Sequence, residues 1–131
     1  MKKNILVVED DPFTQQFYDF LFAKLGFKLF QTENGEEIFN ILNSQDISLI
    51  ILDINLKNTY LNNKKVDGVI ISQKIKKEIK YSHIPVLLVT AYQKKSGERN
   101  YLDDSCADDY IVKPITDYND LLNKVNKLIL K

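Results

Sequence analysis

An unbroken apolar run that ends in a carboxylate, at residues 49–53, constrains the fold more than any other stretch of the chain. Four apolar residues precede Asp53, and a run without polar alternation is typical of a strand buried on both faces of a parallel sheet. Parallel strands deliver residues to one shared edge, where ligand sites lie. Asp53 is therefore a candidate functional residue, although an aspartate after a strand also serves as a turn or helix-capping carboxylate.

The composition indicates one ordinary domain over residues 1–131. The chain is 44% hydrophobic, which is enough for a core that folds without metal or disulfides. Eighteen basic and eighteen acidic side chains cancel, so no global field favours nucleic acid or a membrane surface. The single cysteine, Cys106, has no internal disulfide partner, and neither a signal peptide nor a spanning helix is visible. We therefore expect a cytoplasmic protein that binds neither nucleic acid nor a membrane.

Apolar runs and helical spacings alternate along the chain. Strands are expected at residues 5–8, 29–30, 49–53, 86–89 and 110–112. A helix is expected after each strand, and its apolar stripe is expected in the core. The stripe of the first helix is Phe13, Phe17, Phe20, Leu21 and Leu25, that of the third (residues 66–79) is Ile71, Ile75 and Ile79, and that of the last is Leu121, Leu122, Val125, Leu128 and Ile129. Residues 57–65 show no sustained periodicity, which predicts a long exposed loop.

Five strands alternating with five helices predict an α/β fold with a doubly wound parallel sheet. The flavodoxin-like strand order, 2-1-3-4-5, would place Glu9 and Asp10 at the end of the first strand opposite Asp53. Converging carboxylates repel one another unless a cation is present, and an all-oxygen site suits Mg²⁺. The fourth and fifth strands would bring Thr90 and Lys113 to the same edge as donors for phosphoryl oxygens. Together, these carboxylates and donors suit phosphoryl transfer to a carboxylate.

Five segments, in this order, resemble the landmarks of response-regulator receiver domains. The segments are residues 5–11, 49–56, 67–68, 89–91 and 107–114. The resemblance covers nearly the whole chain and implies a signalling domain of a two-component phosphorelay. It implies that Asp53 accepts a phosphoryl group from a phosphohistidine on a sensor histidine kinase or a phosphotransfer protein. Such a domain is no enzyme in the ordinary sense, because it catalyses only its own phosphorylation and dephosphorylation.

The resemblance also implies a set of Mg²⁺ ligands. Asp10 and Asp53 would bind the ion directly, and Asn55 would bind it through its backbone carbonyl. Glu9 would hold a metal-bound water. Every one of these residues lies at the expected end of the first or third strand.

The remaining implied residues connect phosphorylation to a partner. Thr90 and Lys113 would grip the phosphoryl oxygens, and a cis peptide between Lys113 and Pro114 would help to aim the lysine. Tyr110 would be a rotameric switch that swings inward when Thr90 is drawn to the phosphoryl group, although a surface tyrosine at a strand end explains the same residue. The switch would alter the face made by helix four, strand five and helix five, which would bind a downstream protein or a second copy of the chain.

Some features depart from the family pattern. Lys57 stands where the family usually has a proline, and residues 54–66 form a long path from Asp53 to Asp67. The expected loop at 57–66 either serves partner recognition, shields the aspartyl phosphate from water, or is an inert insertion. Cys106 stands where the family commonly has a glycine, and we expect it to be a small buried residue.

Three other functions compete with a stand-alone phosphoacceptor. A degenerate receiver would use the same fold as a constitutive docking module, which the long loop allows and the complete set of Asp53, Thr90 and Lys113 opposes. An aspartate-dependent phosphatase needs an Asp-x-Asp pattern after its first strand, whereas residues 53–55 follow the third strand and read Asp-Ile-Asn. A flavin carrier needs a phosphate-cradling loop after the first strand, where residues 9–11 are acidic.

Overall fold

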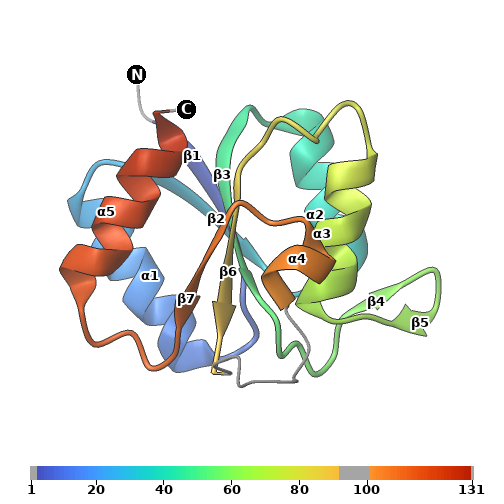
Figure 1. The fold of residues 1–131 in the computed structure, drawn as a ribbon, viewed down its shortest axis with the longest axis horizontal. Helices are drawn as coiled ribbons and strands as arrows, with labels where there is room; N and C mark the ends of the chain where they lie inside the picture. Colours follow the sequence, from blue (N-terminus) through green and yellow to red (C-terminus); the bar gives the residue numbers. More distant parts are fainter. Residues whose placement is uncertain (1–2, 92–100, 131) are drawn as a thin grey trace.

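A parallel sheet lies between two layers of helices in the computed structural model, which describes residues 3–91 and 101–130 (Figure 1). Its strand order is β2-β1-β3-β6-β7, and every neighbouring pair is parallel. The five parallel strands therefore have the predicted 2-1-3-4-5 order. The strands are β1 (Asn4–Val8), β2 (Lys28–Thr32), β3 (Ile47–Asp53), β6 (Val86–Thr90) and β7 (Asp109–Val112).

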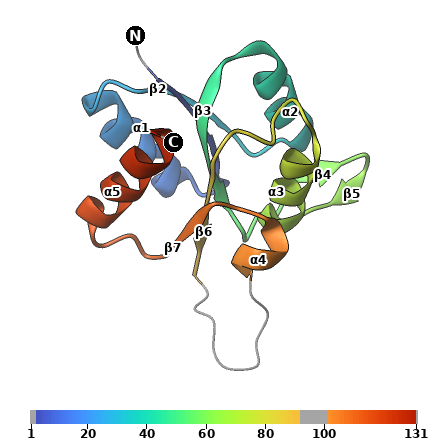
Figure 2. The same ribbon diagram turned by 45° about the horizontal axis from the view of Figure 1, so that its top comes forward.

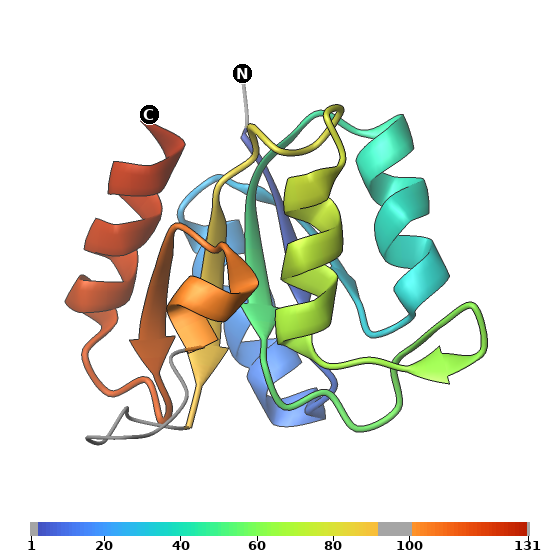
Figure 3. The same cartoon turned by 45° about the vertical axis from the view of Figure 1, so that its right-hand side comes forward.

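The helices divide between the two faces of the sheet. Helices α1 (Pro12–Lys24) and α5 (Tyr118–Ile129) cover one face, as Figures 1 and 3 show. Helices α2 (Gly35–Ser44), α3 (Gly68–Lys77) and α4 (Tyr101–Ser105) lie on the other face. Side chains of a strand alternate between the faces, so the core has two clusters. Along β1, Ile5 and Val7 pack with α1 and α5, whereas Leu6 and Val8 pack with α2 and α3.

Acidic or amide side chains cap the four longer helices at their N-termini. Each cap accepts a hydrogen bond from a backbone N–H in the first turn, which satisfies one of the donors that a helix start leaves free. The caps are Asp11, Asn34, Asp67 and Asp117. In α1, Pro12 adds a fixed φ at the first helical position.

The buried face of α1 differs from the predicted stripe. Tyr18 and Phe22 are fully buried, whereas Phe13 and Phe20 are 83% and 73% exposed. Aromatic residues occupy several sides of this helix, so spacing alone does not single out the side that meets the sheet. Contact with the sheet selects Tyr18 and Phe22 as the centre of the buried face. Of the predicted stripe, Phe17 and Leu21 are partly buried against this core, whereas Phe13, Phe20 and Leu25 are exposed.

The expected long loop after β3 contains a short hairpin instead. Strands β4 (Tyr60–Leu61) and β5 (Lys64–Lys65) pair antiparallel. Asn62 and Asn63 join them with φ values of 51° and 66°, in the left-handed region that asparagine tolerates in two-residue hairpin turns. The prediction of an irregular loop failed because two-residue strands are too short to show a period.

The hairpin is fixed against the start of α2. The Oγ1 hydroxyl of Thr59 is buried and donates to the carbonyl of Glu33 at 2.7 Å. Gly35 permits close approach, because a Cβ there would overlap with the carbonyl oxygen of Tyr60. Figure 2 shows the hairpin beside α2 and α3, and Figure 3 places it at the end toward which the parallel strands point. The hairpin therefore lies near the edge that carries the candidate site.

Two further expectations need correction. Helix α3 ends at Lys77, so Ile71 and Ile75 are buried as predicted but Ile79 lies outside the helix and is 92% exposed. Cys106 is exposed, with a left-handed φ of 62° that follows from its place just after α4. Among the helices built from residues 3–91 and 101–130, none is long and apolar enough to cross a membrane.

Candidate functional site

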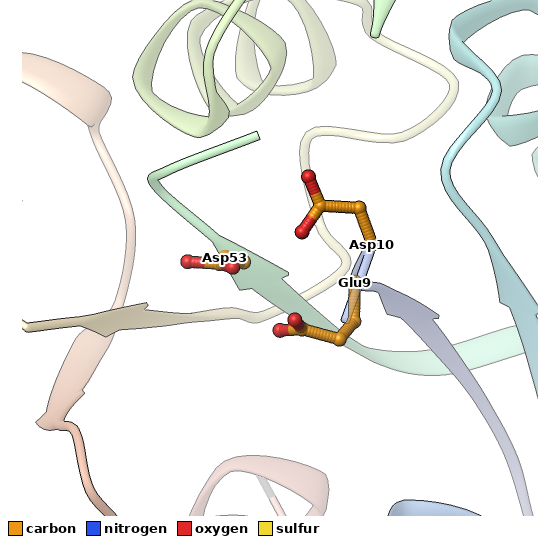
Figure 4. Close-up of side chains that lie close together, drawn as sticks. All are labelled: Glu9, Asp10 and Asp53. Atoms are coloured by element: carbon orange, nitrogen blue, oxygen red, sulfur yellow. The ribbon is translucent and has the colours of Figure 1, made fainter. Parts of the chain in front are cut away.

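Three carboxylates meet at the carboxyl edge of the sheet, as Figure 4 shows. Glu9 and Asp10 follow β1, and Asp53 is the last residue of β3. Because β1 and β3 are paired in the sheet, their ends adjoin. Each side chain offers an oxygen that lies within 4.8 Å of the others. Glu9 and Asp53 are buried and Asp10 is partly buried, so the predicted convergence is present.

Lys113 adds a positive charge to this cluster. Its Nζ lies 2.9 Å from Oδ2 of Asp53 and 3.2 Å from Oε2 of Glu9. The lysine follows β7, its backbone N–H donates to the carbonyl of Thr90 at 2.7 Å, and the expected cis peptide joins it to Pro114. The ends of β6 and β7 thus bring Thr90 and Lys113 to the edge that the sequence predicted.

Burial and mutual repulsion set the charge state of the site. Desolvation and the neighbouring charge of Asp53 raise the pKa of Glu9 from 4.5 to about 7. Burial alone lowers the pKa of Lys113, but its contacts with Asp53 and Glu9 outweigh burial, and the net shift is upward. The lysine is therefore held as an ammonium, and Glu9 binds a proton more readily than an ordinary glutamate.

Backbone N–H groups orient the carboxylates. The N–H of Asn55 donates to Oδ1 of Asp53 at 3.1 Å, and the N–H of Asp11 donates to Oε1 of Glu9 at 3.0 Å. The N–H of Lys57 donates to Oδ2 of Asp10 at 2.9 Å. None of these three bonds was predicted from the sequence. The available signal was that residue 57 is not a proline, since proline has no N–H to donate.

The other predicted residues lie around the carboxylates. Thr90 is the last residue of β6 and is buried. Asn55 is exposed just beyond Asp53. Tyr110 lies on β7 with its side chain 45% exposed, so in this structure it occupies the surface position that either a switch residue or an ordinary strand-end tyrosine would have. Its movement stays a prediction.

The donor set fits a hard divalent cation. Carboxylate oxygens from Glu9, Asp10 and Asp53 match the ligands that Mg²⁺ prefers. A bound cation would also offset the repulsion that raises the pKa of Glu9. Chemically, the arrangement can present Asp53 as a nucleophile with cationic groups beside it.

Comparison with protein families identifies the domain type. The family model described as the response regulator receiver domain matches residues 5–126. Among characterised relatives, the polar-differentiation response regulator DivK of Brucella anthropi is 29% identical over 116 residues, which span 88% of each chain.

Two solved structures illustrate the similarity. The response regulator TrrA of Thermotoga maritima, in complex with Mg²⁺ and BeF, is 32% identical with a TM-score of 0.75, and the match covers 96% of this chain and 98% of that one. The receiver domain of the sensor histidine kinase PA1611 of Pseudomonas aeruginosa, with magnesium coordinated in its active-site cleft, has a TM-score of 0.82 and full coverage of both chains. At 21% identity the second structure supports the fold alone.

Proposed function

Since this chain belongs to the response regulator receiver domain family, we propose that it takes a phosphoryl group onto Asp53 from a phosphohistidine of a sensor histidine kinase or a phosphotransfer protein. One observation carries the proposal. Asp53 ends a central strand with Glu9 and Asp10 within 4.8 Å and with the ammonium of Lys113 at 2.9 Å. A carboxylate that only capped a turn would not need two neighbouring carboxylates and an ammonium group.

The proposed transfer is a displacement at phosphorus. An oxygen of Asp53 forms a bond to phosphorus, the phosphorus–nitrogen bond of the phosphohistidine breaks, and the histidine nitrogen leaves with the electron pair. Lys113 stabilises the negative charge on the phosphoryl oxygens, and Thr90 donates its hydroxyl to one of them. The aspartyl phosphate later hydrolyses in the same site, so the chain catalyses its own phosphorylation and dephosphorylation and no other reaction.

Mg²⁺ is the proposed cofactor. Asp10 and Asp53 would hold it directly, Asn55 through its backbone carbonyl, and Glu9 through a bound water. The ion would supply positive charge for the phosphoryl oxygens as they approach Asp53. The 4.8 Å grouping of the three carboxylates supports this assignment.

The proposed output is a change of surface. Once phosphorylation draws Thr90 toward Asp53, Tyr110 would turn inward from its exposed position and reshape the α4–β7–α5 face. Hydrogen bonds to charged groups contribute about 1.5–3 kcal/mol each, and turning a 1:99 mixture into 99:1 takes about 5.5 kcal/mol. Two bonds from Thr90 and Lys113 would supply most of that energy. A protein partner would bind the reshaped face.

Phosphorylation by a small-molecule donor tests the proposal. Acetyl phosphate with Mg²⁺ is expected to add one phosphoryl group to the wild type, seen by intact-mass spectrometry, and none to Asp53→Asn. Asp67→Asn provides a control, because Asp67 caps α3 and makes no contact with the carboxylate cluster among the described residues. The proposal fails if the wild type stays unmodified with acetyl phosphate and with a phosphohistidine donor. Binding of beryllofluoride with Mg²⁺, seen as a rise in melting temperature, separates an active site from a docking module.

A further inference from the structure

A buried tyrosine hydroxyl lies under the site without a hydrogen-bond partner in the part of the chain that the structure describes. Tyr18 in α1 is fully buried, and among the described residues its Oη makes no hydrogen bond. Buried polar side-chain atoms are nearly always hydrogen-bonded. By contrast, the hydroxyl of Tyr81, on the opposite side of the sheet, donates to Oδ1 of Asn43. The exception at Tyr18 therefore calls for a functional explanation.

The sheet places Tyr18 on the same face as the reactive side chains. Tyr18 packs in one cluster with Val7 of β1 and Ile51 of β3. Because side chains alternate along a strand, the residues two positions further on point to the same face. Those residues are Glu9 and Asp53. The phenol and the two buried carboxylates thus share one side of the sheet.

The direction of α1 brings the hydroxyl toward the carboxylates. Helical side chains lean back toward the helix N-terminus, and α1 begins at Pro12, directly after the acidic residues. Tyr18 lies about 9 Å along the axis from that start, a distance that a phenol spans in large part. Burial raises the pKa of Tyr18, and the charges of Glu9 and Asp53 raise it further. The phenol is therefore within electrostatic reach of both.

Glu9 depends on a donor that the proposed reaction needs elsewhere. Its Oε1 accepts from the N–H of Asp11, and its Oε2 accepts from Nζ of Lys113 at 3.2 Å. Lys113 is shared with Asp53. When a phosphoryl group is attached to Asp53, Lys113 turns to its oxygens, and Glu9 loses its charged donor. The N–H of Asp11 and the proposed metal-bound water are then its remaining donors, and the loss of a donor to a buried carboxylate is costly.

We propose that Tyr18 is a positioning residue, whose hydroxyl donates to Oε2 of Glu9 in the phosphorylated state and holds that carboxylate toward the divalent cation. The inference rests on the proposed function. It gives a role to a buried hydroxyl that has no partner among residues 3–91 and 101–130. In the resting state Lys113 donates to Glu9, and the Tyr18 hydroxyl is not needed there.

The variant Tyr18→Phe removes only the hydroxyl and tests the role. Its affinity for beryllofluoride with Mg²⁺, measured by isothermal titration calorimetry, is expected to fall roughly tenfold. Its affinity for Mg²⁺ alone should be unchanged, because Lys113 still donates a hydrogen bond to Glu9 when no phosphoryl mimic is present. In EDTA, Tyr18→Phe should unfold at no lower urea concentration than the wild type, since an unsatisfied buried hydroxyl has been removed.

Tyr81→Phe is the matched control, because it removes a buried tyrosine's hydroxyl that does have a partner. This control should lower stability in urea and leave both affinities unchanged. Equal beryllofluoride affinity in Tyr18→Phe and wild type overturns the inference and leaves the proposed function standing. An equal loss of affinity for Mg²⁺ alone also overturns it, because the hydroxyl would then act before the phosphoryl group arrives. A wild type that binds neither ligand overturns the proposed function and the inference together.

Discussion

The raised pKa of Glu9 makes the stability of the metal-free protein depend on pH. Burial and the charge of Asp53 move this pKa from 4.5 to about 7 in the folded protein, and the unfolded chain restores the ordinary value. A proton therefore binds folded Glu9 more tightly than unfolded Glu9. Between pH 4.5 and 7 the folded state holds more protons, so the free energy of unfolding falls as the pH rises.

The size of the effect follows from the shift. One pKa unit corresponds to about 1.4 kcal/mol, so a shift from 4.5 to about 7 gives a loss on the order of 3 kcal/mol across this range. Glu9 is only 1% exposed, so solvent screening reduces the figure little. Lys113 adds nothing in this window, because its pKa is raised above 10.5 and its contribution is lost only at higher pH.

Urea denaturation in EDTA at several pH values measures the loss, and Glu9→Gln isolates it. The wild type should lose stability between pH 4.5 and 7 relative to Glu9→Gln, which cannot titrate at this position. Glu36→Gln, at an exposed site in the first turn of α2, should run parallel to the wild type. Adding Mg²⁺ should stabilise the wild type more at pH 7 than at pH 5, because cation and proton compete for the carboxylates. Parallel curves for wild type and Glu9→Gln would refute the reasoning.

Three backbone positions give further predictions. Lys57→Pro removes the N–H that donates to Asp10 and is expected to weaken Mg²⁺ binding about tenfold in calorimetry. Lys57→Ala keeps the N–H and should bind Mg²⁺ with wild-type affinity. Equal affinities of the two variants would show that this hydrogen bond does not orient Asp10. Cys106→Gly relieves a φ of 62° and is expected to stabilise the protein by about 1 kcal/mol in urea denaturation, and a loss of stability would contradict this. In Gly68→Ala the new Cβ would overlap with the backbone of Asp53. We therefore expect the free energy of unfolding to fall by about 1–3 kcal/mol and phosphorylation by acetyl phosphate to be slower. Wild-type values for both would show that the backbone shifts without cost.

Local sequence was enough to predict the parallel sheet and the residues at its strand ends. Uninterrupted apolar runs mark strands that are buried on both faces, and each run ends where a polar residue can reach the edge of the sheet. That rule alone placed Asp53, Thr90 and Lys113 at one edge of the sheet, together with the carboxylates that follow β1. The rule succeeds because a parallel sheet sends all its strand ends to one side, whatever the details of packing.

Only the tertiary structure decided which contacts complete the site. Aromatic residues occupy several sides of α1, so its sequence does not show which side is buried. The way in which the helix meets the sheet decides this, and with it the place of Tyr18. The hairpin after β3 depends on its attachment at Gly35, and the bond from Lys57 to Asp10 is made by a backbone group that every residue except proline carries. Such contacts join residues distant in the chain and leave no periodic trace. The sequence alone therefore determined that Asp53 ends a central strand among acidic and basic residues, and the packing decided which groups hold those residues in place.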